Sequence, residues 1–82
     1  MDQKEIFNKV VKLISPYAKN KDALDAINDN TKILEDLGVN SARLVDIVLA
    51  FEDDFDIEVE DDVADKILTI GDAVKVIDGK IN

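Results

Sequence analysis

The sequence predicts an all-α protein, a small four-helix bundle with three longer helices and one short third helix. Three observations lead to this fold class. Apolar residues recur three or four positions apart along most of the chain, which is the spacing of one helix face. The strict apolar–polar alternation that marks strands is almost absent. The length suits one domain and not two, so residues 1–82 are expected to fold as a single unit.

The first helix is expected to begin at a capping box formed by Asp2 and Glu5. It should end near Ser15, because Pro16 disfavours helical geometry at the residue before it. Its apolar stripe consists of Ile6, Phe7, Val10, Val11, Ile14 and Tyr17.

The connection over residues 18–37 is less regular, and one short helical turn is expected within it. A connection of this length usually packs back onto the core of a compact domain. Ile33, Leu34 and Leu37 are the predicted anchors, and Gly38 interrupts the chain before the second helix.

The second helix is predicted to begin at Asn40 and Ser41, which are good N-cap residues, and to run to about Phe55. At 100° per residue, one face carries a normal core stripe of Leu44, Ile47, Val48, Phe51 and Phe55. A second apolar strip on another face consists of Ala42, Val45 and Leu49, bordered by the carboxylates of Asp46, Glu52 and Asp53. A helix that buried one face would not need this strip, so we interpret it as a docking surface for a partner with a basic rim.

The last two helices are expected after an acidic loop over residues 56–61. A short helix should cover residues 62–68, with Val63, Ala64 and Ile67 turned inward. Thr69 and Asp72 form a second capping-box pattern. The final helix should carry its apolar face inward and fray near Gly79.

The acidic charge is concentrated in one part of the chain. The formal net charge is −9, and residues 46–65 contain ten acids and no base. This excess disfavours binding to nucleic acid or to anionic membrane surfaces, both of which need Lys and Arg. No apolar run approaches the roughly 18 residues of a membrane span. No export signal is visible, so we expect a cytoplasmic protein.

Histidine and cysteine are both absent from the sequence. Disulfides, a thiolate nucleophile and a Cys- or His-ligated metal site are therefore excluded. Ser41 has no histidine to activate it as a nucleophile, so we do not expect an enzyme. Its plain structural role is helix capping. A helix N-terminus would also accommodate a phosphodiester on Ser41, because its N–H groups and dipole favour phosphate.

The acidic run partly matches the pattern of a calcium site. Asp54, Asp56 and Glu58 alternate as the first EF-hand ligands do. Val59 replaces the glycine that the loop needs, and Asp65 replaces the final glutamate. We therefore predict no specific metal site, and we expect only loose binding of divalent cations, because ten like charges within twenty residues repel one another.

The run Glu35-Asp36-Leu37-Gly38-Val39-Asn40-Ser41 is similar to the signature E-D-L-G-x-D-S-L of the acyl carrier protein family. The similarity is strong over residues 31–78 and looser in the first helix. The resemblance implies a four-helix carrier domain. A phosphopantetheinyl transferase would attach 4′-phosphopantetheine from coenzyme A to Ser41. The terminal thiol of that arm would hold acyl groups as thioesters, so the chain would be a carrier and not a catalyst.

The resemblance also implies partners and a place for the cargo. A monomeric carrier would present its cargo to acyl-transferring and synthase enzymes of fatty acid, lipid or polyketide biosynthesis, which dock through basic patches. The implied docking positions are Ala42, Arg43, Val45, Asp46, Leu49, Glu52 and Asp53. The candidates for an acyl cavity are Leu37, Ile47, Phe51, Val63, Ile67 and Ala73, for which core packing is the alternative role.

The chain departs from the family pattern next to the serine. The family motif D-S-L-[DE] reads Asn40-Ser41-Ala42-Arg43 here, which removes an acid and a leucine and adds a cation. We therefore expect a specialised carrier, with its own transferase preference or acyltransferase, and not the housekeeping member. A second hypothesis is an acidic helical adaptor that binds a basic partner and is never modified.

Overall fold

The computed structural model describes residues 1–81 and is built from four α-helices. These are α1 (Gln3–Ile14), α2 (Leu44–Phe55), α3 (Asp61–Ala64) and α4 (Ile70–Ile81). Three short 3-10 helices cover Ser15–Tyr17, Asp22–Ala26 and Ser41–Arg43. Within residues 1–81 no strand forms, and one isolated β-bridge joins Lys32 to Thr69. The all-α prediction is confirmed.

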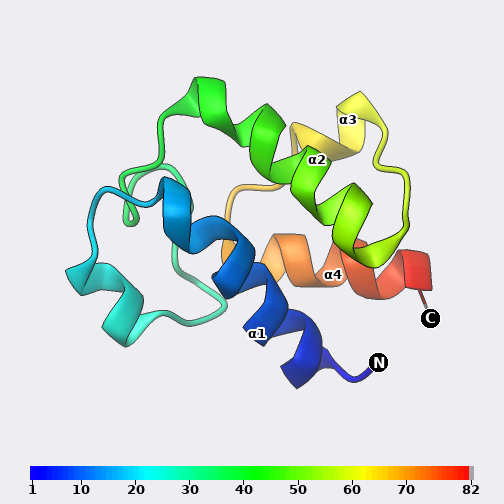
Figure 1. Cartoon of the computed structure of the whole chain (residues 1–82), viewed down its shortest axis with the longest axis horizontal. Helices are drawn as coiled ribbons and strands as arrows, with labels where there is room; N and C mark the ends of the chain where they lie inside the picture. The colour runs from blue at the N-terminus through cyan, green and yellow to red at the C-terminus, as the bar shows by residue number, and fades with distance from the viewer. Residues whose placement is uncertain (82) are drawn as a thin grey trace.

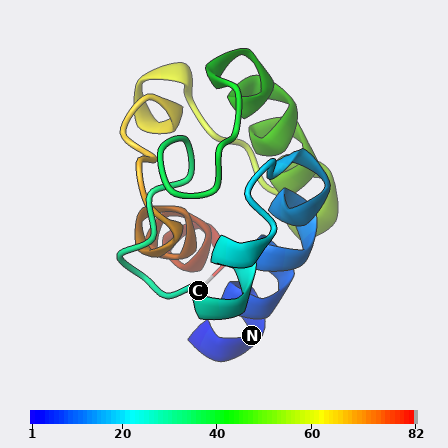
Figure 2. The ribbon, with the colours of Figure 1, turned by 90° about the vertical axis from the view of Figure 1, so that its left-hand side faces the viewer.

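The three long helices surround the core, and the long connection between α1 and α2 closes one end of it (Figure 1). The N-terminus and the end of α4 lie together at the other end in both ribbon views (Figure 2). Phe51 of α2 is the largest fully buried side chain. The predicted stripe of the first helix supplies another part of the core, because α1 buries Ile6, Val10 and Ile14, while Phe7, Val11 and Tyr17 are half-buried. The anchors Ile33 and Leu37 are also fully buried.

Local capping interactions set where α1 and α4 begin. The Asp2 carboxylate accepts a 2.8 Å hydrogen bond from the Glu5 N–H. Thr69 and Asp72 cap reciprocally, since Asp72 Oδ2 accepts from the Thr69 N–H and Thr69 Oγ1 accepts from the Asp72 N–H, both at 3.1 Å. The predicted capping box is therefore reciprocal at Thr69 and Asp72, whereas at Asp2 and Glu5 the structure gives the N-cap bond alone.

Three predicted helix boundaries need correction. Residues Ser41–Arg43 form a 3-10 helix and the α-helix begins at Leu44, because the Asn40 carbonyl accepts from the Arg43 N–H, three residues ahead. The third helix ends at Ala64, so the predicted range of 62–68 was too long. The last helix continues through Gly79 to Ile81 and does not fray there. Lys80 contacts Glu60 at 3.0 Å and Ile81 packs against the core, which hold this end in place.

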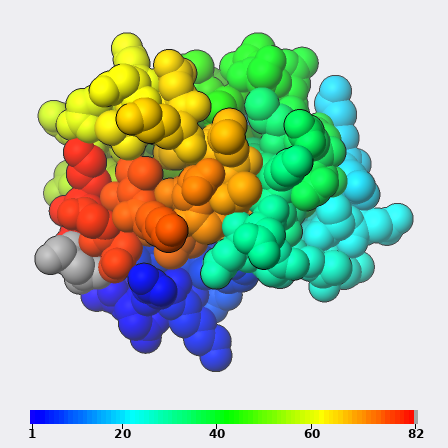
Figure 3. All heavy atoms as spheres, turned by 180° about the vertical axis from the view of Figure 1, so that it is seen from behind, coloured from blue at the N-terminus to red at the C-terminus, as the bar shows by residue number. Residues whose placement is uncertain are grey.

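The connection before α2 is fastened to the segment that leads into α4. Ile33 N–H donates to the Leu68 carbonyl at 3.0 Å, and Gly71 N–H donates to the Asp29 carbonyl at 2.8 Å. Figure 3 shows the two segments side by side on the back of the molecule. These two hydrogen bonds hold in place the connection that leads to Ser41.

Candidate functional site

A tight turn presents Ser41 at the start of the second helix. Gly38 has a φ of 68°, a left-handed conformation that glycine adopts without steric cost. Asn20 secures the turn from the other side, because its N–H donates to the Leu37 carbonyl at 3.0 Å and its side-chain amide donates to the Asp36 carbonyl at 3.1 Å. The Asp36 carboxylate also accepts from the Lys32 N–H at 2.8 Å, so backbone and side-chain hydrogen bonds together hold the turn.

Asn40 takes the role of N-cap, as predicted. Its Oδ1 accepts a 2.9 Å hydrogen bond from the Ala42 N–H. Capping is thus supplied by the residue before the serine, and the Ser41 side chain is not needed for it. The plain structural role considered for Ser41 is filled by its neighbour.

Ser41 also differs from the other Ser and Thr residues in what its hydroxyl does. Ser15 Oγ donates to the Val11 carbonyl at 2.7 Å, and Thr31 and Thr69 accept backbone N–H groups within the fold. Ser41 is exposed, and within residues 1–81 its hydroxyl makes no hydrogen bond to another residue. It is the hydroxyl that an approaching enzyme can reach.

An open groove of about 490 Å³ begins at Ser41 and runs between α2 and the segment that contains α3. Glu52, Asp61 and Asp65 supply its remaining polar groups. Its apolar lining comes from Leu44, Val45, Val48, Leu49, Val59 and Ala64. A reachable hydroxyl at the mouth of an apolar groove suits a long, flexible group that is attached at the serine.

The sequence did not single out Val59, Asp61, Ala64 and Asp65 as site residues. Val59 had one recognisable signal, since it is an apolar residue inside a strongly acidic run. Its burial, with 9% of the residue exposed, shows that it faces the protein.

The second apolar strip of α2 is exposed. Val45 is 64% exposed and Leu49 is 53% exposed, while Ile47 and Phe51 on the core face are fully buried. Ala42 and Asp53 are exposed as well. The division into a core face and a surface strip matches the helical angles, and the use of that strip for docking stays a prediction.

Three charged docking candidates, Arg43, Asp46 and Glu52, have partners within the fold. Arg43 Nη1 lies 3.1 Å from Asp46 Oδ2. Glu52 is half-buried, and its Oε2 accepts a 3.0 Å hydrogen bond from the Val59 N–H. Of the three acids predicted around the strip, Asp53 is exposed, and Asp46 and Glu52 are half-buried.

The six residues predicted for an acyl cavity do not line the groove. Val63 is half-buried, and the groove wall is formed by other residues. The remaining five belong to the packed core, namely Leu37, Ile47, Phe51, Ile67 and Ala73. Their role in holding a chain stays a prediction, and core packing is what the structure displays.

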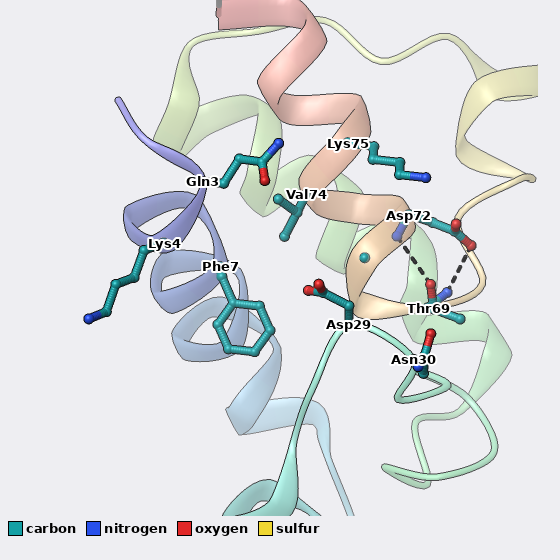
Figure 4. A pocket seen from close by; sticks show the side chains of 10 residues that line it. Gln3, Lys4, Phe7, Asp29, Asn30, Thr69, Asp72, Val74 and Lys75 are labelled. Atoms are coloured by element: carbon teal, nitrogen blue, oxygen red, sulfur yellow. Dashed lines mark hydrogen bonds between the residues drawn. The ribbon is translucent and has the colours of Figure 1, made fainter.

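A second hollow of about 460 Å³ lies between the first turns of α1 and α4 (Figure 4). Its polar lining includes the capping pair Thr69 and Asp72, and it shares no residue with the groove at Ser41. The ammonium groups of Lys4 and Lys75 point away from it in opposite directions. No cation is therefore directed into this hollow.

Among residues 1–81, no group of three or more acidic side chains is placed to hold a metal ion. The same part of the chain has no helix long and apolar enough to cross a membrane.

Comparison with known proteins bears on this site. A family model described as a phosphopantetheine attachment site matches residues 8–77. The acyl carrier protein of Lactobacillus acidophilus (strain ATCC 700396 / NCK56 / N2 / NCFM) is 44% identical over 78 residues, which are 94% of each protein. The chain belongs to the acyl carrier protein family. The solved structure of the acyl carrier protein from Enterococcus faecalis superposes with a TM-score of 0.80 at 35% identity, covering 98% of this chain and 99% of that one.

Membership of the family establishes the cofactor and the kind of function. This acyl carrier protein carries acyl groups on phosphopantetheine, whose terminal thiol supplies the thioester chemistry. The residues present suit such an arm, because Ser41 is exposed at a helix N-terminus and opens onto an apolar groove. The carrier interacts with a transferase and with synthase enzymes as a member of this family.

Proposed function

We propose that Ser41 is the attachment residue and that residues 1–82 act as one carrier domain. The observation that carries this proposal is the free, exposed Ser41 hydroxyl on a turn whose capping is already supplied by Asn40. Its oxygen, which loses its proton, would form a phosphodiester with the 4′-phosphopantetheine part of coenzyme A. The pyrophosphate P–O bond of coenzyme A would break, and adenosine 3′,5′-bisphosphate would leave. Residue 82 lies outside the described residues.

The N-terminal turn suits the charge that this bond would bring. The nearest helix begins at Ser41, and the N–H end of a helix favours an anion. Since histidine and cysteine are absent from the sequence, we infer a carrier whose reactive thiol comes from its cofactor and not a catalyst.

We further propose that partner enzymes dock on the exposed strip formed by Ala42, Val45 and Leu49. The partners are the phosphopantetheinyl transferase and acyl-transferring enzymes of the cytoplasm with a basic rim around an apolar patch. The carboxylates that border the strip favour a basic partner, because residues 46–65 contain no Lys or Arg that would repel it. A partner enzyme that is specialised for this carrier would contact Arg43.

The cargo is proposed to enter the groove between α2 and α3. The groove begins at the attachment residue and its lining is mainly apolar, which favours burial of an alkyl chain. The predicted cavity residues of the core would be reached only by a chain that extends beyond the groove.

Loading by a transferase tests the proposal. The protein is incubated with coenzyme A and a broad-range phosphopantetheinyl transferase, and its intact mass is measured. Wild type should gain one phosphopantetheine and Ser41→Ala none, whereas Ser15→Ala should load as wild type does. A failure of wild type to gain mass with several transferases would favour the adaptor, which rests on the docking strip alone.

A further inference from the structure

A pocket of about 370 Å³ lies where the segment after α1 meets the start of the second helix. Figures 1 and 2 both show these two parts of the chain close together. The pocket shares no residue with the apolar groove that begins at Ser41. Its lining contains two cations and no carboxylate, and consists of Pro16, Tyr17, Ala18, Lys19, Asn40 and Arg43. Since Asn40 and Arg43 flank the serine in the chain, the pocket adjoins the turn that presents Ser41.

Lys19 is held beside this turn by its neighbours. The next residue, Asn20, donates from its N–H and its side-chain amide to the carbonyls of Leu37 and Asp36. A β-carbon at Gly38 would lie 3.4 Å from the Lys19 β-carbon, so the lysine packs close to the glycine of the turn. Its side chain is exposed, and its ammonium group makes no ion pair or hydrogen bond with another of the described residues. The position of Lys19 is therefore fixed while its charge is unpaired.

Arg43 is only partly occupied by its ion pair. Its Nη1 lies 3.1 Å from Asp46 Oδ2, and a guanidinium has five N–H donors, so other donors remain available. The pair is exposed, and pairs of that kind are weak. Asn40 adds a neutral donor, because its Oδ1 accepts from the Ala42 N–H and its amide nitrogen makes no hydrogen bond within residues 1–81. The pocket can thus offer several N–H groups to an anion.

The charge of the chain is segregated around this pocket. Residues 6–21 contain four bases and no acid, whereas residues 46–65 contain ten acids and no base. The two departures from the family motif beside the serine act in the same direction. Asn40 removes a negative charge, and Arg43 puts a positive charge where the motif has a negative one. Within a strongly acidic protein, the surroundings of Ser41 on this side are therefore cationic.

We propose that Lys19 and Arg43 bind the phosphodiester of the attached arm. This inference rests on the proposed function, because it requires the arm on Ser41. The phosphodiester carries a negative charge and is bonded directly to the serine oxygen, so it lies next to the pocket. Arginine and lysine both form strong hydrogen bonds with phosphate oxygens, because donor and acceptor are ionised. The phosphate then links the segment after α1 to the start of the second helix, and loading stabilises the contact between them.

Three substitutions separate this site from the general effect of charge. Lys19→Gln and Arg43→Gln each remove one cation and keep a long polar side chain. Lys66→Gln is the matched control, because Lys66 is an exposed lysine that lines neither the pocket nor the groove. Each protein is studied in its unmodified form and as the purified loaded fraction, whose intact mass is confirmed. Every loaded protein is compared with its own unmodified form, so a change in the stability of the fold itself cancels.

The rise in melting temperature on loading is the first measurement. In wild type this rise should be roughly 2–4 °C larger than in Lys19→Gln or Arg43→Gln, the shift for about one exposed ion pair in a domain of this size. Lys66→Gln should show the wild-type rise. The difference should shrink as NaCl is added, because salt screens exposed charges. An equal rise in all four proteins overturns the proposal, and a smaller rise in only one pocket variant overturns a site shared by two cations.

Phosphorus NMR of the loaded proteins is the second measurement, and it reports on the phosphate itself. The phosphorus resonance of the arm should move in Lys19→Gln and in Arg43→Gln, and it should coincide with that of wild type in Lys66→Gln. One common resonance position in all four proteins overturns the proposal. A wild-type protein that never loads contradicts the proposed function instead. Loading at Ser41 without any dependence on the two cations leaves the proposed function intact and removes this inference alone.

Discussion

Arg43 and Asp46 form an ion pair across the first turn of α2, with 3.1 Å between Nη1 and Oδ2. Both side chains are substantially exposed, so the pair contributes little to stability. It does change the charge of the proposed docking surface, because the ion pair partly neutralises Asp46, one of the predicted acids. Arg43 is therefore the residue at which we expect this carrier to differ from a housekeeping one.

Reversing the charge at Arg43 should make the carrier more acceptable to housekeeping enzymes. Arg43→Glu frees Asp46 and adds a carboxylate, while the free energy of unfolding changes by less than about 0.5 kcal/mol. The measurement is competition between this carrier and a housekeeping carrier for fatty acid synthase enzymes. Wild type should be turned over more slowly than the housekeeping carrier, and the turnover of Arg43→Glu should come closer to that of the housekeeping carrier. Equal turnover of wild type and the housekeeping carrier would remove the idea of a specialised member.

Removing apolar side-chain area from the exposed strip should weaken docking of a partner without unfolding the protein. Leu49 is 53% exposed, so Leu49→Ala loses little burial, but it removes apolar area from the strip. The expected result is a higher Kd for the loading transferase at an unchanged melting temperature. Phe51→Ala on the buried face is the opposite case and should cost about 3–5 kcal/mol of unfolding free energy. If Leu49→Ala binds the transferase as wild type does, the strip is not where this partner docks.

Two glycines of α4 should respond in opposite directions to alanine. A β-carbon at Gly71 would lie 2.9 Å from the Asp29 carbonyl oxygen, so Gly71→Ala should lower stability by about 1–3 kcal/mol. A β-carbon at Gly79 would have no heavy atom within 4 Å, so Gly79→Ala should raise stability by up to about 1 kcal/mol. Urea unfolding of both variants checks this. Destabilisation by Gly79→Ala would mean that the end of α4 is not helical in solution.

The capping box of α4 should make stability depend on acid pH. Burial raises the pKa of Asp72, but hydrogen bonds from the N–H groups of Leu68 and Thr69 outweigh it, so the pKa lies below its ordinary value. The stabilisation is complete above the ordinary pKa of an aspartate and is lost as pH falls through the lower native pKa. Asp72→Ala should cost about 1 kcal/mol at neutral pH.

The measurement for Asp72 is unfolding free energy at neutral pH and near pH 3. The difference between wild type and Asp72→Ala should shrink in acid, because the wild-type carboxylate becomes protonated. The pKa of Glu60 also lies below its ordinary value, because its own backbone N–H and Lys80 lower it. Lys80→Gln is therefore a useful second variant. If the difference in unfolding free energy between wild type and Asp72→Ala were larger in acid than at neutral pH, the result would contradict this account of the cap.

Short-range features of the fold could be predicted from sequence. The capping pairs Asp2–Glu5 and Thr69–Asp72 depend on residues three positions apart, and the stripes of α1 and α2 depend on helical spacing. The turn at Gly38 and the cap at Asn40 followed from residue type. These are the features that place Ser41.

Features that depend on distant residues could not be predicted. The end of α4 was expected to fray at Gly79, yet Lys80 reaches Glu60, twenty positions earlier in the chain. The groove wall was missed because the Val59 position depends on the Glu52 side chain, seven residues away. Five of the six cavity residues that the family resemblance implies lie in the packed core, and their role in holding a chain stays a prediction.

The central claim is that Ser41 carries the arm, and the most direct measurement is fragmentation mass spectrometry of the protein purified from its native host. The account predicts one phosphopantetheine, with or without an acyl group, on the fragment that contains Ser41 and none on the fragment that contains Ser15. The mass of the acyl group would also identify the cargo. A protein that is uniformly unmodified, or modified at a residue other than Ser41, would contradict the account.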